Sequence, residues 1–524
     1  MYYHLTKSDC LCADILLLLG YSSEFPLSYD MEINVLNNMS FQTKLSFMSN
    51  TNFDLKLKNW KCIKEEKFMS VISNIMRVMF ANVFNLGSSF IVGFILPAYL
   101  SVNEYGMYRQ FTLYLSFVFI FNFGFNDGIF IKYGGKSGNE IDEIELLKEH
   151  SFINAFQLII SLIMLVVSLV LKNQLFILFS VATFFVTMFT YHRNFLQATG
   201  EFKVYSISNI IQTVTNIITI LFVVFVLKSN QSVNYILATI VTQIITYAFM
   251  EYYFIKSYGL KFIIGKKGIL KNFKVGIFIL IANLSMSFIG NVGAWITNIG
   301  LSVYEFAQYS FSISMLNIIL MIINSVGLVF YNVISKNKNE QMLNFIKTVL
   351  LILGVFGGIL FFIFKIIITS FLSKYVDSIL LFSITFISIP YIMVANVIIN
   401  NLYKARNDER KYFKDSLLLA IFALLFVGII FVATHSVKMI AFATTAVYIL
   451  WYLYSTEHEF SFLKNTRKEI SLLVSHVIVF YFTANFLSSI QGIIIYAVYL
   501  LIIMLLFKNE FMKGFSYFRK KESL

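Results

Sequence analysis

The chain has 524 residues, enough for two to four soluble domains, but its composition excludes a soluble protein. Hydrophobic residues make up 58% of it, charged residues make up 13%, and the mean hydropathy is +0.75. Soluble domains carry about 25% charged residues, because their surfaces must stay hydrated. These values predict an all-α polytopic membrane protein. A nucleic-acid partner is a poor explanation for the net charge of +13, because the chain is too hydrophobic.

Residues 1–68 differ from the rest of the chain. They hold all three cysteines and no apolar run that could span a membrane, since the run ILLLL at 15–19 is far shorter than the roughly 20 residues needed. No second pair of ligands follows Cys10 and Cys12 at zinc spacing. We expect a disordered cytoplasmic leader or a start codon assigned too early, with the membrane pattern beginning at Met69.

From Met69 onward, hydropathy predicts about fourteen transmembrane helices. They lie near 75–100, 107–131, 150–171, 174–191, 204–227, 232–255, 274–297, 303–331, 343–364, 376–400, 415–434, 437–454, 470–488 and 490–507. The connections between them are short. We therefore expect a first six-helix bundle with a basic loop (69–272), a second six-helix bundle (273–455), and two extra helices with a basic tail (456–524).

The basic residues set an orientation for these spans, because Lys and Arg resist translocation. Only six of them fall in the odd-numbered connections: Arg109, Lys172, Lys228, Lys365, Lys374 and Lys438. The even-numbered connections and the C-terminal tail hold most of the others. Both termini are therefore predicted to be cytoplasmic. The basic stretch from Lys256 to Lys274 fits either an amphipathic helix on anionic lipid headgroups or a solvated loop.

The sequence contains an internal repeat with an offset of 201 residues. LSVNEYGMY at 100–108 aligns with LSVYEFAQY at 301–309, at the turn between an odd span and the next. The offset contains six spans, an even number, so both halves have the same orientation. The axis that relates them is predicted to run along the membrane normal, as in transporters whose two bundles rock about a central site.

Polar residues of the repeat fall on one face of each first helix. Span 1 carries Asn82, and span 7 carries Asn283 and Asn291, each within a series of polar or small residues at helical spacing. Polar groups are costly in hydrocarbon, so these faces are expected to point inward. They indicate either a hydrated cavity between the halves or close helix packing through small residues.

Ionisable residues inside spans are candidates for function because they are costly in a membrane. Asp127 lies in span 2, and we expect Lys132 or Arg77 to be its partner; Arg193 closes span 4. Cations at the mouth of a cavity could bind an anionic headgroup. Glu104 and Glu305 are expected to cap the helices that follow them. The six histidines are expected to form no cluster with acidic residues.

Three short segments resemble the MOP superfamily, in particular the Wzx-like polysaccharide or O-antigen flippases. They are LSVNEYGMYRQF after span 1, GFNDGIFIKYGGK at the end of span 2, and FLQATGEFKVYS at 195–206. The resemblance covers about 69–455. It implies a MATE-like fold of two six-helix bundles and the movement of an undecaprenyl-pyrophosphate-linked oligosaccharide to the outer leaflet of the bacterial inner membrane. The leader and the two C-terminal helices depart from a family often described with twelve spans.

The sequence thus predicts a flippase that acts by alternating access in surface-polysaccharide synthesis, for example of O-antigen or capsule. Its expected partners are the lipid-linked oligosaccharide, membrane lipids and polysaccharide polymerase machinery, and it needs no cofactor or metal. Arg77 and Arg193 would contact phosphate, which binds well to arginine, while Asn82 and Asn283 would line the path. The alternative is a cation-coupled drug antiporter on the same fold. No enzyme motif is present.

Overall fold

The structure is a computed structural model. It describes residues 92–136, 140–263, 268–336, 339–405 and 409–508, with Gly87, Ser89, Gly265 and Glu510. The chain divides into two compact units, residues 1–77 and 78–524, and every described residue belongs to the second. The predicted leader, Arg77 and Asn82 therefore lie outside the described residues.

Every regular element in this described part is helical, as predicted. The first helices are α5 (Val102–Leu115), α6 (Phe125–Tyr133), α7 (Glu143–Val170), α8 (Gln174–Ala198), α9 (Phe202–Phe225) and α10 (Ser232–Tyr258). The chain continues with α11 (Ile269–Gly300), α12 (Val303–Lys336), α13 (Glu340–Gly357), α14 (Ile359–Phe371), α15 (Ser378–Phe386), α16 (Ile389–Val394) and α17 (Asn400–Ala405). The last four are α18 (Glu409–Thr434), α19 (Val437–Tyr454), α20 (Arg467–Phe486) and α21 (Ser489–Leu506).

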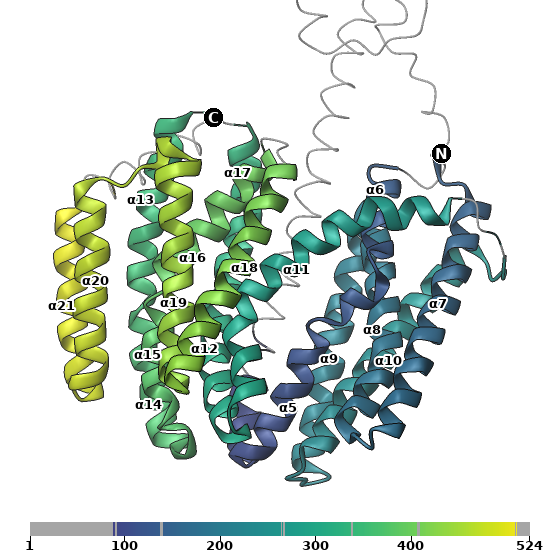
Figure 1. Ribbon diagram of the computed structural model, residues 1–524, viewed down its shortest axis with the longest axis horizontal. Coiled ribbons are helices and arrows are strands. Elements are labelled where there is room, and N and C mark those ends of the chain that lie inside the picture. Colours follow the sequence, from purple (N-terminus) through teal and green to yellow (C-terminus); the bar gives the residue numbers. More distant parts are fainter. Residues whose placement is uncertain are drawn as a thin grey trace, which may run out of the picture. The chain divides into compact units, whose positions relative to one another are not determined.

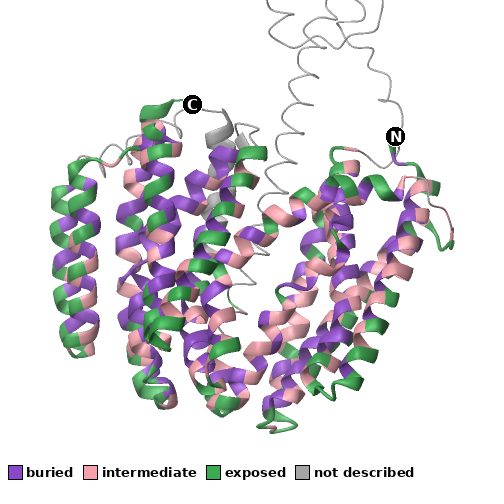
Figure 2. Cartoon of the chain, viewed as in Figure 1, coloured by how far each residue is buried: buried purple, intermediate pink, exposed green. Residues whose placement is uncertain are grey.

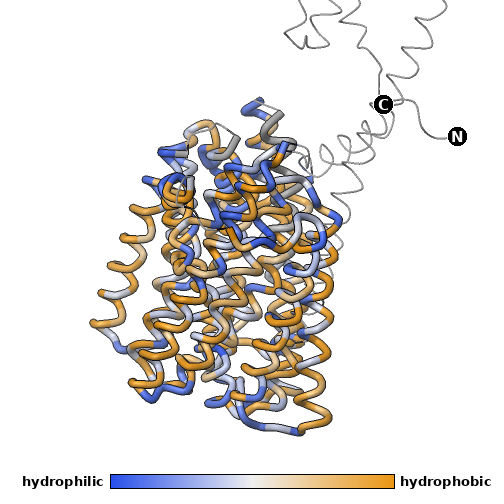
Figure 3. Tube along the Cα trace, turned by 90° about the vertical axis from the view of Figure 1, so that its right-hand side faces the viewer, coloured by the Kyte–Doolittle hydropathy of each residue, from blue (hydrophilic) through white to orange (hydrophobic). Residues whose placement is uncertain are grey.

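The helices form a multi-pass membrane protein. Ten of them are long and apolar enough to cross a membrane, and two bent helix pairs raise this to twelve among the described residues. The helix α12 corresponds to predicted span 8, whereas most of predicted span 1 is not described. The count of fourteen stays a prediction. Hydrophobic residues form the middle of the helices and hydrophilic residues gather at both ends (Figure 3).

The internal repeat is visible in the backbone. Helical residues end at Tyr99 in the first half and at Gly300 in the second, and the next helices begin at Val102 and Val303. The hydrogen bonds of this turn also repeat, because Leu100 N–H donates to Leu96 O and Leu301 N–H donates to Thr297 O. The two helix ends, the two helix starts, the two donors and the two acceptors are each 201 residues apart, the predicted offset. The two halves therefore fold into the same turn.

The helices fall into two groups, α5–α10 and α12–α19, with α11 passing obliquely between them (Figure 1). In the first group α8 packs against α6, α7 and α10, and in the second α15 packs against α12 and α19. Across the groups, α11 contacts both α6 and α18, and α5 packs along α12. The predicted pair of extra helices, α20 and α21, packs on α13–α15. The predicted domain boundaries stay predictions.

Two spans are broken. The pair α5–α6 bends by 63°, and the break contains Phe123 and Gly124 with φ of 52° and 86°, a left-handed conformation that suits glycine. The helix α15 and the helical segment Ile389–Tyr403 that follows it form a pair bent by 47°, and Pro390 lies in the first turn of α16 at this bend. A Cβ on Gly354 would lie 2.4 Å from Pro390 Cα, so this crossing requires glycine.

Burial follows the pattern of a protein in a lipid solvent. Many large apolar side chains are exposed, among them Phe371, Leu505 and Val170. Exposed residues are frequent on the outer faces of the helices (Figure 2). Many of the buried polar residues are Ser and Thr, whose hydroxyls donate to carbonyls of the preceding helical turn, as Thr246 does to Thr242. Because a membrane offers no water to a free hydroxyl, this local bonding lets polar residues pack inside.

Candidate functional site

Asp127 and Asn283 are brought together. Asp127 lies in the first turn of α6 after the break, and Asn283 Nδ2 on α11 lies 3.5 Å from its Oδ1. The two helices approach closely through glycine: a Cβ on Gly276 would lie 1.8 Å from Gly124 O, and one on Gly128 would lie 2.2 Å from Asn272 O. The two glycines of the GFNDG segment thus let α6 pack against α11.

Of the two partners expected for Asp127, Lys132 pairs with other residues, and Arg77 lies outside the described residues. Its Nζ lies 2.8 Å from Glu145 Oε1 and 2.7 Å from Glu149 Oε1. Asp127 and Lys132 are five residues apart on one helix, about 140° around its axis, so they point to different neighbours. The two carboxylates more than neutralise the positive charge of Lys132. Binding of an anionic headgroup at Lys132 is therefore disfavoured.

Glu149 is the centre of this network. It is 1% exposed, and it accepts hydrogen bonds from Lys132, from Tyr133 Oη at 2.8 Å and from Asn272 Nδ2 at 2.6 Å. The network joins α6, α7 and α11. We interpret it as structural, because each donor is already satisfied by the carboxylate.

Arg193 and Asn291 make contacts of their own. Arg193 Nη2 donates to Tyr205 Oη at 3.0 Å, and its guanidinium lies over the rings of Phe189 and Tyr205. Asn291 Nδ2 donates to Ser287 O in its own helix at 2.9 Å. In the part of the chain that is described, no hydrogen bond or ion pair joins Arg193 to Asp127. The phosphate-binding role of Arg193 stays a prediction.

A polar cavity lies between α5 and α12, and sequence reasoning missed it. It has a volume of about 190 Å³, and Tyr105, Tyr108, Arg109, Ser314 and Asn317 are among its lining residues. Arg109 Nε is buried and finds no hydrogen-bond partner among the described residues. The side chain lies about two turns into α5, roughly 10 Å from its start. A guanidinium whose Nε is left without a partner in such a cavity is suited to an anion.

A larger apolar cavity, about 630 Å³, opens between α5, α8, α11 and α18. Its wall is mostly aromatic and aliphatic, with Tyr114 stacked at 5.5 Å on both Phe176 and Trp295. Two polar atoms of its lining, Trp295 Nε1 and Asn298 Oδ1, are buried and unpartnered by the described residues. Asn298 Nδ2 donates to Tyr114 Oη at 3.1 Å. This cavity can take an apolar group with a few polar contacts.

Residues of α5 contribute to the lining of both cavities. Arg109 and its neighbours line the polar cavity, and Tyr114 and Phe117 line the apolar one. No carboxylate occurs among the residues that line either cavity, all of which are described. The sequence signal was present, because Arg109 is an arginine within a span, but its nearness to the predicted outer end suggested a side chain reaching the interface.

The repeat-related glutamates both cap helices, but in different ways. Glu305 accepts from Ser302 N–H at 3.1 Å and thus caps α12, as predicted. Glu104 Oε2 instead accepts from Ser232 N–H at 2.5 Å, at the start of α10. It therefore ties the beginning of α5 to the beginning of α10.

The expectation about histidines is wrong. His150 on α7 and His192 on α8 both place Nε2 against the carboxylate of Glu251 on α10. These residues are 42 to 101 positions apart in the sequence, and only the packing of the three helices brings them together. Spacing along the chain could not reveal the cluster.

Comparison with solved structures identifies the fold. A lipid II flippase MurJ in an inward closed conformation aligns with a TM-score of 0.61 and 16% identity, over 84% of this chain and 99% of that one. An inward-facing multidrug resistance MATE family transporter of the MOP superfamily aligns with a TM-score of 0.50 and 13% identity, over 73% of this chain and 98% of that one.

Sequence comparisons add no relative, since no protein-family model and no curated protein matches the chain. At identities this low the structural matches describe the fold alone. The all-helical, two-bundle membrane architecture of this chain is that of the lipid II flippase and of the MATE transporter.

Proposed function

We propose that the protein flips a lipid-linked oligosaccharide, with undecaprenyl pyrophosphate as the carrier, across the cytoplasmic membrane of a bacterium. The observation that carries the proposal is that residues of α5 line both an apolar cavity and a polar one. One is apolar and aromatic, and the other is lined by Arg109, whose Nε has no partner among the described residues. An amphiphile with an apolar chain and an anionic headgroup needs both environments. Arginine suits its phosphates, and hydroxyl and amide groups suit its sugars.

The similarity to a lipid II flippase supports this proposal. The protein in that structure is a flippase of lipid II.

In the proposed cycle, the two bundles rock about their contact at α5 and α12 and open the cavities to one leaflet at a time. Both termini face the cytoplasm, as the distribution of Lys and Arg predicts. The product would serve surface-polysaccharide synthesis, of which O-antigen and capsule are examples. Polymerase machinery on the outer side would then be a partner.

The second candidate is a drug antiporter driven by a cation, on the fold of the MATE transporter. The apolar cavity of about 630 Å³ favours it, because its size suits a small apolar drug. A coupled cation requires a carboxylate, and none of the described residues that line the two cavities supplies one. Arg109 would also repel a cationic drug. We therefore favour the flippase.

Deletion of the gene separates the two proposals. The leaflet that holds the lipid-linked oligosaccharide is measured with an impermeant probe on spheroplasts, before and after permeabilisation. The flippase proposal predicts that the precursor accumulates on the cytoplasmic side and that surface polymer is lost. Normal outward transfer together with new sensitivity to cationic drugs would contradict it and favour the antiporter.

A further inference from the structure

The cluster of His150, His192 and Glu251 lies inside the first helix group, apart from both cavities. One residue comes from each of α7, α8 and α10. Their side chains are 8%, 3% and 17% exposed, so the cluster is enclosed by protein. The three residues lie six or seven positions from the start of α7, the end of α8 and the end of α10, which is about 10 Å at the helical rise. All three of these helix ends are predicted to be cytoplasmic.

The donor atoms converge on one point. His192 Nε2 lies 2.9 Å from Glu251 Oε2, and His150 Nε2 lies 3.1 Å from Oε1 and 3.2 Å from Oε2 of the same carboxylate. One ligand atom from each residue lies within 4.8 Å of the others. Ligands at about 2.0–2.2 Å from a tetrahedral metal are themselves about 3.3 Å apart. The separations between each imidazole nitrogen and the carboxylate are close to that value.

The hydrogen-bond roles in the cluster conflict without a cation. His150 Nε2 also lies 3.0 Å from Asn154 Nδ2, whose amide donates to the His150 carbonyl at 3.2 Å. A proton on Nε2 suits Glu251 but faces the amide donor, and a lone pair on Nε2 faces the carboxylate lone pairs. A cation between the imidazoles and the carboxylate removes the repulsion between these lone pairs, because each of the three groups then directs a lone pair at it, and the Asn154 amide keeps its hydrogen bond to the His150 carbonyl.

A further polar group near the cluster lacks a partner. Tyr191 is fully buried, its ring centroid lies 5.9 Å from that of His150 and 5.4 Å from that of His192, and its hydroxyl has no hydrogen-bond partner among the described residues. Phe254 stacks on His150 at 4.2 Å and excludes water from that side. The surroundings are thus tightly packed, with an unused hydroxyl near the imidazoles.

We propose that His150, His192 and Glu251 bind one divalent transition-metal ion, with Zn²⁺ as the best fit. Two imidazoles and one carboxylate form a ligand set typical of zinc, whereas Na⁺, Mg²⁺ and Ca²⁺ prefer oxygen ligands. The carboxylate compensates half of the charge of a divalent ion. By joining α7, α8 and α10 near one end, the metal holds the first bundle together as a rigid body while it moves against the second.

Metal content tests the proposal directly. In the full chain used for this test, Cys10, Cys12 and Cys62 are all replaced by serine, so that the N-terminal cysteines cannot bind zinc. The protein is purified with a tag that contains no histidine. The protein is stripped with a chelator, reloaded with Zn²⁺, desalted and analysed by mass spectrometry. We expect about one zinc per chain, and at least a tenfold loss in His192→Gln and in Glu251→Gln. His476→Gln is the control, because this histidine is equally buried but lies on α20.

A spectroscopic measurement on the chain with its metal ligands intact covers the case in which those variants fail to fold. X-ray absorption at the zinc edge is expected to show two imidazole nitrogens at about 2.0–2.1 Å together with oxygen. A shell of oxygen alone would overturn the proposal. So would zinc content that is negligible, or that is the same in His192→Gln and Glu251→Gln as in their parent.

Discussion

Gly106 and Ala307 occupy the same position in the two repeats, and they touch. A Cβ built on Gly106 would lie 3.2 Å from the Cβ of Ala307 and 2.8 Å from Val303 O. Residues related by a two-fold axis contact each other only where the axis passes between them. The contact of α5 with α12 therefore marks the axis of the repeat, and the polar cavity with Arg109 lies beside it.

We expect Gly106→Ala to destabilise the protein, because the added methyl group overlaps the Val303 backbone. Overpacking of this kind costs about 1–3 kcal/mol. Gly428→Ala is the matched control: it is also in a helix, nothing lies within 4 Å of its Cβ, and replacing glycine there should stabilise by about 0.5–1 kcal/mol. Thermal unfolding in detergent measures both. Equal midpoints would contradict the close contact at the axis.

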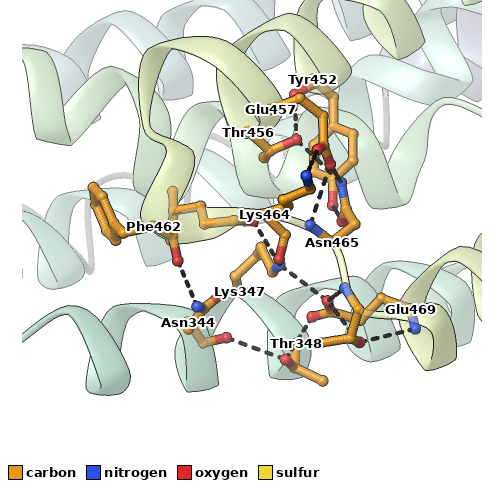
Figure 4. A network of polar contacts seen from close by, with 12 residues as sticks. Asn344, Lys347, Thr348, Tyr452, Thr456, Glu457, Phe462, Lys464, Asn465 and Glu469 are labelled. Atoms are coloured by element: carbon orange, nitrogen blue, oxygen red, sulfur yellow. Dashed lines mark hydrogen bonds and ion pairs between the residues drawn. The ribbon is translucent and has the colours of Figure 1, made fainter.

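The docking of α20 depends on a buried ion pair. Lys347 Nζ on α13 lies 3.0 Å from Glu469 Oε2 on α20, and also donates to the carbonyls of Leu463 and Lys464 (Figure 4). Lys347→Met leaves the buried Glu469 carboxylate without this cation, although Thr348 and Thr466 still donate hydrogen bonds to it. The loss of the cation is expected to cost about 3 kcal/mol.

The control for this pair is Lys464→Ala. Lys464 lies 3.9 Å from Glu457 and its side chain is 74% exposed, so the loss of that pair should cost about 0–1 kcal/mol. The two variants are compared by thermal unfolding. A Lys347→Met protein as stable as Lys464→Ala would show that the pair does not secure the C-terminal helices.

Arg109 is expected to bind the pyrophosphate. Arg109→Ala should reduce flipping by about 10- to 100-fold, since a hydrogen bond to a charged group contributes about 1.5–3 kcal/mol. Lys438→Ala removes an exposed cation at the same predicted membrane face and should leave the rate unchanged. Transport is measured alongside the amount of folded protein. Equal rates in the two variants would exclude Arg109 from the substrate path.

The apolar cavity is expected to hold the lipid chain, so filling it should block transport. Leu284 lines the cavity from α11, and Leu284→Trp adds bulk there. Leu418→Trp makes the same change on α18, at a side chain that is 55% exposed. We expect transport to fall in the first variant only, with unfolding midpoints showing that both proteins are folded. Unchanged transport in Leu284→Trp would place the lipid elsewhere.

The sequence predicted what depends on hydropathy and local pattern. The aligned turns LSVNEYGMY and LSVYEFAQY became identical helix boundaries, and the spans after the first correspond to helices or bent helix pairs. Asn283 is exposed and meets Asp127, and its predicted place on the substrate path stays a prediction. These features follow from residue types and their periods.

Contacts between distant residues could not be predicted in this way. Lys132 was expected to pair with Asp127, yet two glutamates of α7 lie closer to it, and only the crossing of α6 and α7 decides this. The break after Phe123 gave no signal in the hydropathy pattern. His150, His192 and Glu251 show the same difficulty, because a ligand set drawn from three helices has no spacing of its own.

Reconstitution into vesicles tests the central claim most directly. The purified chain is placed in proteoliposomes with an undecaprenyl-pyrophosphate-linked oligosaccharide, and an impermeant reagent measures the fraction of headgroups exposed outside over time. Our account predicts that headgroups sealed inside become accessible with the intact chain and far more slowly with Arg109→Ala. Headgroups that become accessible no faster than in protein-free vesicles would contradict it.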